Sequence, residues 1–164
     1  MPALAAGKMA PDILLPDMHG KQFSLRSALQ HGPVLLAFFK ISCPICQYTM
    51  PFLERICRAL GLKAQVLGVS QNDKKDTAHF LREYGISFPV LLEDSSHYPA
   101  SNAFRITNVP TLFLIAPDGE IEVSSVGWSK QDVEDINRRL AQALSAKPAP
   151  VFHRGEQVED FKAG

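Results

Sequence analysis

The sequence predicts an α/β fold in which helices flank a central mixed β-sheet. In the first half of the chain, two mainly apolar segments that are typical of buried strands, 33–39 and 64–70, lie on either side of an amphipathic stretch. This is the strand-helix-strand order of two parallel strands. In the second half, the runs 111–115 and 120–124 are joined by a short turn and followed by another amphipathic stretch. Such a hairpin supplies the antiparallel strands of a mixed sheet.

The composition is that of one soluble domain. The chain has 164 residues, of which 46% are hydrophobic and 21% are charged. Lys plus Arg and Asp plus Glu each total 17, and no long block carries one sign, so we expect no nucleic acid partner. The longest apolar runs are far shorter than the ~20 residues of a membrane-spanning helix, so no membrane span is expected. We divide the chain into a domain over 1–146 and a C-terminal tail over 147–164.

The first residues predict a cytoplasmic protein. Residues 1–8 lack the basic start and the apolar block of roughly 7–15 residues that a secretory signal contains. A chain from which a signal had been removed would look the same, and such a protein would be exported.

The elements of the first half follow from local patterns. Residues 10–17 read as an extended segment, which a glycine turn separates from a short helical segment at 26–29. The runs 33–39 and 64–70 are buried strands, and the helix between them covers 44–60. Together these segments give the parallel strand pair of the sheet.

The second half is punctuated by turn and cap residues. The predicted elements are a helix over 76–84, a short strand over 88–92, a helix over 98–104, and strands over 111–115 and 120–124. Pro117, Asp118 and Gly119 suit the tight turn between the last two strands. Ser129 caps a final helix that runs to about Leu144.

The tail allows two interpretations. Pro148 and Pro150 stop the last helix, and single apolar residues then alternate with charged ones. One interpretation is a frayed tail. The other is an extended arm whose Phe152 and Phe161 dock on the domain or on a neighbouring copy, and the choice between a monomer and a weak homodimer stays open with it.

The candidate catalytic residues are Cys43 and Cys46, which lie where the strand 33–39 meets the helix 44–60. The thiolate is the attacking species, and an ordinary cysteine with a pKa near ~8.5 is mostly protonated at neutral pH. Lowering the Cys43 pKa to ~7 requires roughly 2 kcal/mol, of which the helix dipole supplies only about 0.3–1. Backbone N–H groups and the Cys46 thiol should supply the rest. We expect Cys43 to attack and Cys46 to resolve the resulting mixed disulfide.

Other roles for the cysteines were weighed. Three cysteines are too few for a disulfide framework, and a zinc site needs two further ligands at fitting spacing. Cys57 and the scattered histidines form no second half of such a site, so we expect no metal and no cofactor. Cys57 itself, on the amphipathic helix, is most simply a packing residue.

The cysteine motif, the order of the elements and the segment 108–111 together resemble the thioredoxin superfamily. Pro51 stands where thioredoxins carry a helix-kinking proline, and Val109 to Thr111 match their cis-proline loop. Residues 126–130 are similar to the glycine turn that borders the thioredoxin substrate groove. The leader at 10–21 resembles the TlpA/ResA and peroxiredoxin-like branch. The resemblance covers about 10–145 and implies a thioredoxin fold with an N-terminal extension.

The chain departs from the thioredoxin pattern at three points. Ser42 replaces the usual Trp before the first cysteine, and Ala37 replaces the buried aspartate that assists proton transfer. Proton removal from the second cysteine then relies on water or Lys40. Pro44 and Ile45 separate the cysteines, and an uncharged Ile45 offers the thiolate no extra stabilisation, so we expect a reducing to intermediate potential.

The resemblance implies a thiol–disulfide oxidoreductase that acts on protein disulfides and is recharged by an external thiol donor. Val109 and a cis Pro110 would present an extended substrate to the cysteines. Pro44 is a further substrate-binding candidate, and Ile45 and Trp128 would form an exposed apolar rim for partners, with simple packing as the alternative.

Two rival functions stay open. A peroxiredoxin-like peroxidase shares the leader, but no Thr lies three residues before Cys43 or Cys46, as the P-x-x-x-T-x-x-C signature requires. A non-catalytic binding module on the same fold would need both cysteines to be incidental.

Overall fold

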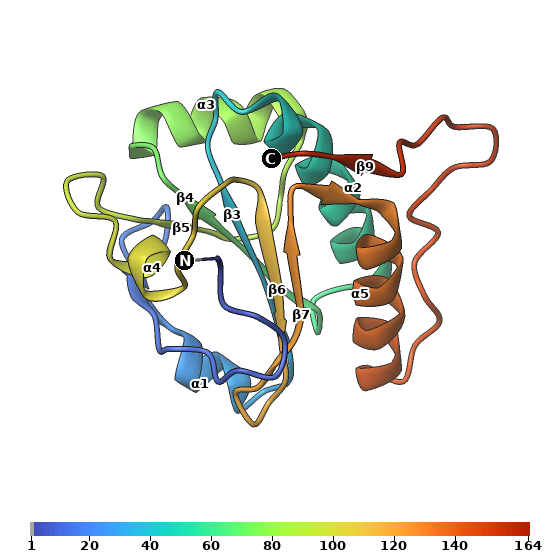
Figure 1. Cartoon of the computed structure of the whole chain (residues 1–164), viewed down its shortest axis with the longest axis horizontal. Coiled ribbons are helices and arrows are strands. Elements are labelled where there is room, and N and C mark those ends of the chain that lie inside the picture. Colours follow the sequence, from blue (N-terminus) through green and yellow to red (C-terminus); the bar gives the residue numbers. More distant parts are fainter. Residues whose placement is uncertain (1) are drawn as a thin grey trace.

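A five-stranded mixed sheet in the order β5-β4-β3-β6-β7 forms the centre of the molecule (Figure 1). The computed structural model describes residues 2–164. The strands of this sheet are β3 (Val34–Phe39), β4 (Gln65–Ser70), β5 (Val90–Leu92), β6 (Thr111–Ile115) and β7 (Ile121–Val126). β4 runs parallel to β3 and β5, whereas β6 runs antiparallel to β3 and β7. The predicted mixed α/β sheet is confirmed.

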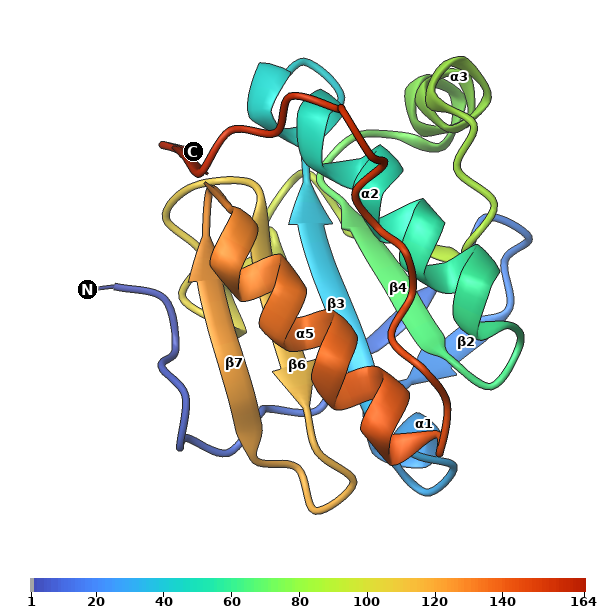
Figure 2. The same ribbon diagram turned by 90° about the vertical axis from the view of Figure 1, so that its right-hand side faces the viewer.

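Helices cover both faces of the sheet (Figures 1 and 2). They are α1 (Leu25–Leu29), α2 (Pro44–Leu60), α3 (Lys74–Tyr84), α4 (Pro99–Ala103) and α5 (Lys130–Ala143). Alternate residues of β3 divide the core, because Leu35 and Phe39 pack with α2, α3 and α5, whereas Leu36 and Phe38 pack with α1 and α4. Within residues 2–164, every helix is too short or too polar to traverse a lipid bilayer.

The predicted helices and strands all form, with small shifts at their ends. α3 begins two residues before its predicted start, because the Asp73 side chain accepts a hydrogen bond from the Asp76 N–H and caps the helix. The leader forms a small hairpin from β1 (Leu14–Pro16) and β2 (Gln22–Ser24). The hairpin leads directly into α1, whose N-cap is Ser24.

The tail is not frayed. After α5 it turns back across α2 towards the end of the sheet at which α2 begins (Figure 2). Ala149 and Val151 are buried, and the Phe152 ring packs 5.5 Å from that of Phe52. β9 (Phe161–Lys162) then pairs antiparallel with β8 (Trp128–Ser129). The docked arm is therefore the right interpretation for Phe152, although the Phe161 side chain stays 64% exposed.

Asn137 on α5 holds the start of the tail. Its amide donates to the Ala149 carbonyl at 2.8 Å and accepts from the Ala149 N–H at 2.9 Å, and all these groups are buried. Asn137→Ala leaves the Ala149 N–H without a partner and removes one of the two donors to the Ala149 carbonyl, since the Val151 N–H still donates to it. We therefore expect the free energy of unfolding to fall by about 1–3 kcal/mol. Urea unfolding measures this loss, and trypsin should cut faster at Arg154. The matched control is Gln142→Ala at an exposed position of α5, and an equal loss in that control would contradict the assignment.

Candidate active site

Cys43 is the N-cap residue of α2. Its backbone is extended, and its sulfur accepts a hydrogen bond from the Cys46 N–H at 3.1 Å. Pro44 follows at the first turn, where its missing N–H costs no hydrogen bond. The helix N-terminus therefore directs both a backbone donor and its positive dipole end at the Cys43 sulfur.

The loop before β6 lies against the same sulfur. The Cys43 thiol donates to the Val109 carbonyl at 3.4 Å, and the Val109–Pro110 peptide bond is cis, as predicted. The Thr111 hydroxyl donates to the Asn108 carbonyl at 2.7 Å and holds this turn. Cys43 and Val109, which are 66 positions apart in the sequence, thus meet at the candidate site.

Cys46 differs from Cys43 in its surroundings. Cys43 is half-buried, whereas Cys46 is fully buried. Burial raises the pKa of the Cys46 thiol well above its ordinary value, and a hydrogen bond with Cys43 adds to the effect. A backbone hydrogen bond with Lys40 opposes the shift without cancelling it. One thiol is therefore reachable, while the other is kept protonated behind it.

A cavity of about 520 Å³ opens beside Cys43. The predicted residues that line it are Pro44, which is exposed, and Ile45 and Val109, which are half-buried. Lys40 lines it as well. Thus Pro44, Ile45 and Val109 gather at one opening, whereas Pro110, the residue after Val109, is buried.

Trp128 corrects the predicted rim. The indole is fully buried, and its Nε1–H donates to the Glu159 carbonyl at 2.6 Å. Tyr48 and Phe52 of α2 pack against it, with ring centroids 5.1 and 4.8 Å away. The expectation that Trp128 is exposed to partners is wrong, because the tail covers it.

Sequence reasoning missed a buried polar group that is hydrogen-bonded to a residue lining this cavity. Glu93 is buried and accepts hydrogen bonds from the N–H and the hydroxyl of Ser101, each at 2.5 Å. The Ser101 hydroxyl accepts in turn from the Gln71 amide at 2.7 Å, and both Ser101 and Gln71 line the cavity. Gln71 directly follows β4, and the parallel strands β3 and β4 end on the same side of the sheet. This position after β4 was the only sequence feature that could have indicated that Gln71 lies near the cysteines.

Comparisons with known proteins identify the family of this chain. The model of the AhpC/TSA family matches residues 6–124. The chain belongs to the AhpC/TSA family. It is 31% identical over 134 residues to the thiol-disulfide oxidoreductase ResA of Halalkalibacterium halodurans, a match that spans 80% of this chain and 74% of ResA.

Solved structures place this AhpC/TSA protein in the thioredoxin fold. A thiol:disulfide interchange protein from a Bacteroides species is 25% identical, with a TM-score of 0.66 over 75% of this chain and 82% of its own. The thioredoxin domain of a Bacteroides vulgatus thiol-disulfide oxidoreductase has a TM-score of 0.72 at 22% identity, over 84% of this chain and 98% of its own. The predicted fold is confirmed, and so is the predicted activity class, thiol–disulfide oxidoreductase.

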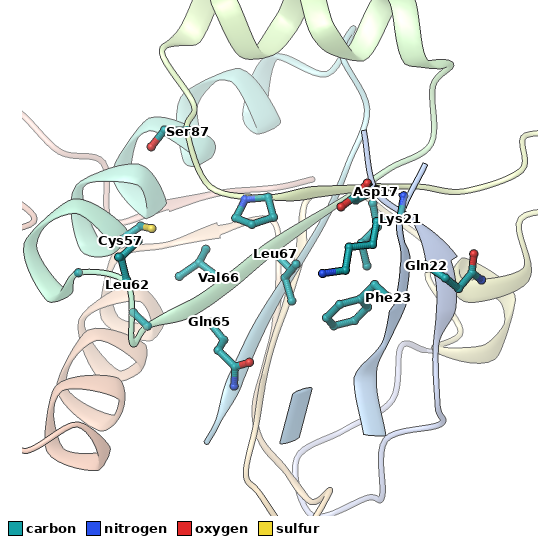
Figure 3. A pocket seen from close by; sticks show the side chains of 14 residues that line it. Asp17, Lys21, Gln22, Phe23, Cys57, Leu62, Gln65, Val66, Leu67 and Ser87 are labelled. Atoms are coloured by element: carbon teal, nitrogen blue, oxygen red, sulfur yellow. Dashed lines mark hydrogen bonds between the residues drawn. The ribbon is translucent and has the colours of Figure 1, made fainter. Parts of the chain in front are cut away.

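A second cavity, also about 520 Å³, lies away from the cysteine pair. Figure 3 shows Cys57 of α2 and Phe23 of β2 on opposite sides of Val66 and Leu67 of β4. Burial raises the pKa of the Cys57 thiol, and the nearby Glu54 charge raises it further. As predicted, Cys57 packs against the core, and its raised pKa keeps it protonated at neutral pH. Across residues 2–164, no three His, Cys, Asp or Glu side chains cluster as metal ligands would.

The protonated state of Cys46 makes stability depend on pH. In the unfolded dithiol chain a cysteine ionises near pH 8.5, whereas burial keeps Cys46 protonated in the native state. The native state then binds more protons above that pH, so the free energy of unfolding should fall as pH rises, by at most about 1.4 kcal/mol per pH unit for this thiol.

Urea unfolding under reducing conditions at pH 8 and pH 10 measures the effect. We expect Cys46→Ala to lose less stability between these pH values than the natural chain, since other titrating groups cancel in the comparison. Cys57 also has a raised pKa, so the variant Cys57→Ala measures how much of the pH dependence comes from that second thiol. Identical pH dependence in the natural chain and Cys46→Ala would contradict the assignment.

Proposed function

We propose that this enzyme reduces protein disulfides and is recharged by an external thiol donor, working as a monomer or weak homodimer. The observation that carries the proposal is the placement of the Cys43 sulfur between the Cys46 N–H and the Val109 carbonyl. That placement joins a stabilised nucleophile to a backbone strip on which an extended peptide can lie.

The reaction balances with the two cysteines alone. The Cys43 thiolate attacks one sulfur of the substrate disulfide, whose S–S bond breaks, and the departing sulfur takes up a proton. Cys46 then loses its proton and attacks the Cys43 sulfur, which releases the second substrate thiol. The substrate gains two electrons and two protons, and Cys43 and Cys46 end as a disulfide. A dithiol donor reverses this change on the enzyme.

Loss of the Cys43 proton also frees the Val109 carbonyl for substrate. In the dithiol state the Val109 carbonyl accepts the Cys43 thiol hydrogen. When Cys43 gives up that proton, the carbonyl is free to accept an N–H from an extended substrate segment. Ile45 and Pro44 border the same opening and supply apolar contact. For the buried Cys46 proton, solvent is the proposed acceptor, and the positive charge of Lys40 favours the thiolate that forms.

Variants of the two cysteines test this order of events. Cys43→Ser should abolish insulin reduction, at least a hundredfold below the natural enzyme, because the first attack is lost. Cys46→Ser should instead accumulate a mixed disulfide through Cys43, which mass spectrometry detects. Cys57→Ser is the matched control and should keep the activity within about twofold, since Cys57 lies in the other cavity.

Peroxide consumption separates the rival function. A peroxidatic cysteine needs only one thiol for its first step, so fast hydrogen peroxide turnover that survives Cys46→Ser, together with no insulin reduction, would replace the reductase proposal with a peroxidase.

A further inference from the structure

The last residues of the sequence lie on the groove beside the reactive cysteine. β9 pairs with β8, the strand that begins directly after Gly127. The Asn108 amide donates to the Gly164 oxygen at 3.1 Å, and Gly164 lines the same cavity as Cys43. Residues 159–164, here named the terminal strip, therefore occupy ground next to the cis-proline loop.

Two glycines allow this close approach. A Cβ on Gly164 would lie 2.8 Å from the Val109 carbonyl oxygen, which is the atom that accepts the Cys43 thiol hydrogen. A Cβ on Gly127 would lie 2.5 Å from the Lys162 oxygen and 2.8 Å from the Gly164 nitrogen. Backbone thus packs on backbone with no space for side chains, as when a peptide strand is added to a sheet edge.

The terminal strip is held by backbone hydrogen bonds at the surface, whereas the part of the tail before it also has buried side chains. The earlier part is fixed by buried Ala149 and Val151 and by the paired Arg55 and Glu156 side chains, 2.7 Å apart. In the terminal strip only Lys162 is half-buried, and its other residues are exposed. Backbone with exposed hydrogen bonds and few buried side chains opens at a lower free-energy cost than the core.

We propose that the terminal strip is a built-in competitor for extended protein substrates. It covers the Gly127 and Trp128 side of the groove, whereas the cavity beside Cys43 stays open. A protein segment that needs both sides must displace the strip, and a small disulfide needs only the open cavity. The apparent affinity for long substrates then equals the intrinsic affinity multiplied by the fraction of molecules in which the strip is open. This inference rests on the proposed function for its substrate class.

Deletion of residues 159–164 tests the competition. We expect kcat/KM for insulin to rise about tenfold, while kcat/KM for the small aromatic disulfide 5,5′-dithiobis(2-nitrobenzoate) changes less than about twofold. Trp128 is the only tryptophan, so its fluorescence should shift to longer wavelength and be quenched more by acrylamide once the Glu159 carbonyl is gone. An unchanged or lower insulin rate with the expected fluorescence shift would overturn the proposal.

A point variant tests the same idea without shortening the chain. Gly164→Ala pushes a Cβ against the Val109 backbone and should raise the insulin rate in the same direction by a smaller factor. Ala163→Ser adds one heavy atom at the exposed neighbouring position and should leave the rate unchanged. An equal response of both variants would speak against displacement of the strip.

Alkylation of Cys43 separates this inference from the proposed function. Deletion should speed the reaction with a maleimide carried on a large polyethylene glycol about tenfold, while the reaction with iodoacetamide stays within about twofold. If the natural and shortened chains both fail to reduce insulin, the proposed function fails, and the ratio of the two alkylation rates still decides whether the strip limits access. A ratio that deletion leaves unchanged would overturn the inference.

Discussion

The hydrogen bond from the Cys46 N–H to the Cys43 sulfur depends on where β3 stops and α2 begins. All six residues of β3 are buried, so the strand is fixed between two core layers and delivers the chain to the helix at one defined point. Pro44 then starts the helix at a position whose backbone N–H would have no partner within the helix, so its missing N–H costs no hydrogen bond. The backbone N–H groups of the first turn are left without helical partners, and a sulfur at the N-cap is the acceptor they meet. Negative charge on Cys43 is stabilised by the same arrangement.

The opposite faces of this junction give the two thiols different chemistry. Cys43 lies at the cavity opening, but Cys46 points into the core cluster that contains Leu35, Met50 and Trp128. Burial in that cluster disfavours the Cys46 thiolate, so Cys46 stays a thiol at neutral pH. Ala37 places no carboxylate at the β3 position where thioredoxins carry the buried aspartate, so the Cys46 proton must pass to another acceptor.

Sequence reasoning succeeded where the signal is local. The buried strands, the cap at Ser129 and the cysteine pair are encoded within a few residues, and the cis Pro110 followed from a short motif. It failed where a side chain's surroundings come from distant residues. Trp128 looks like a rim residue until Glu159 accepts its N–H, and the bonds among Glu93, Ser101 and Gln71 join three separate segments. No periodicity or cap encodes such contacts.

Helix α2 links the nucleophile to the tail, because it begins directly after Cys43 and carries residues that hold the tail. Tyr48 lies two positions after Cys46, and its hydroxyl accepts the Glu159 N–H at 3.1 Å, while Lys162 lies over its ring. Arg55, two turns further along α2, binds Glu156 through two parallel hydrogen bonds of 2.7 and 2.8 Å. The same helix thus fixes the Cys43 sulfur at its N-terminus and the tail along its side. Reactivity and access are consequently set relative to the same element, so a shift of α2 that altered one would alter the other.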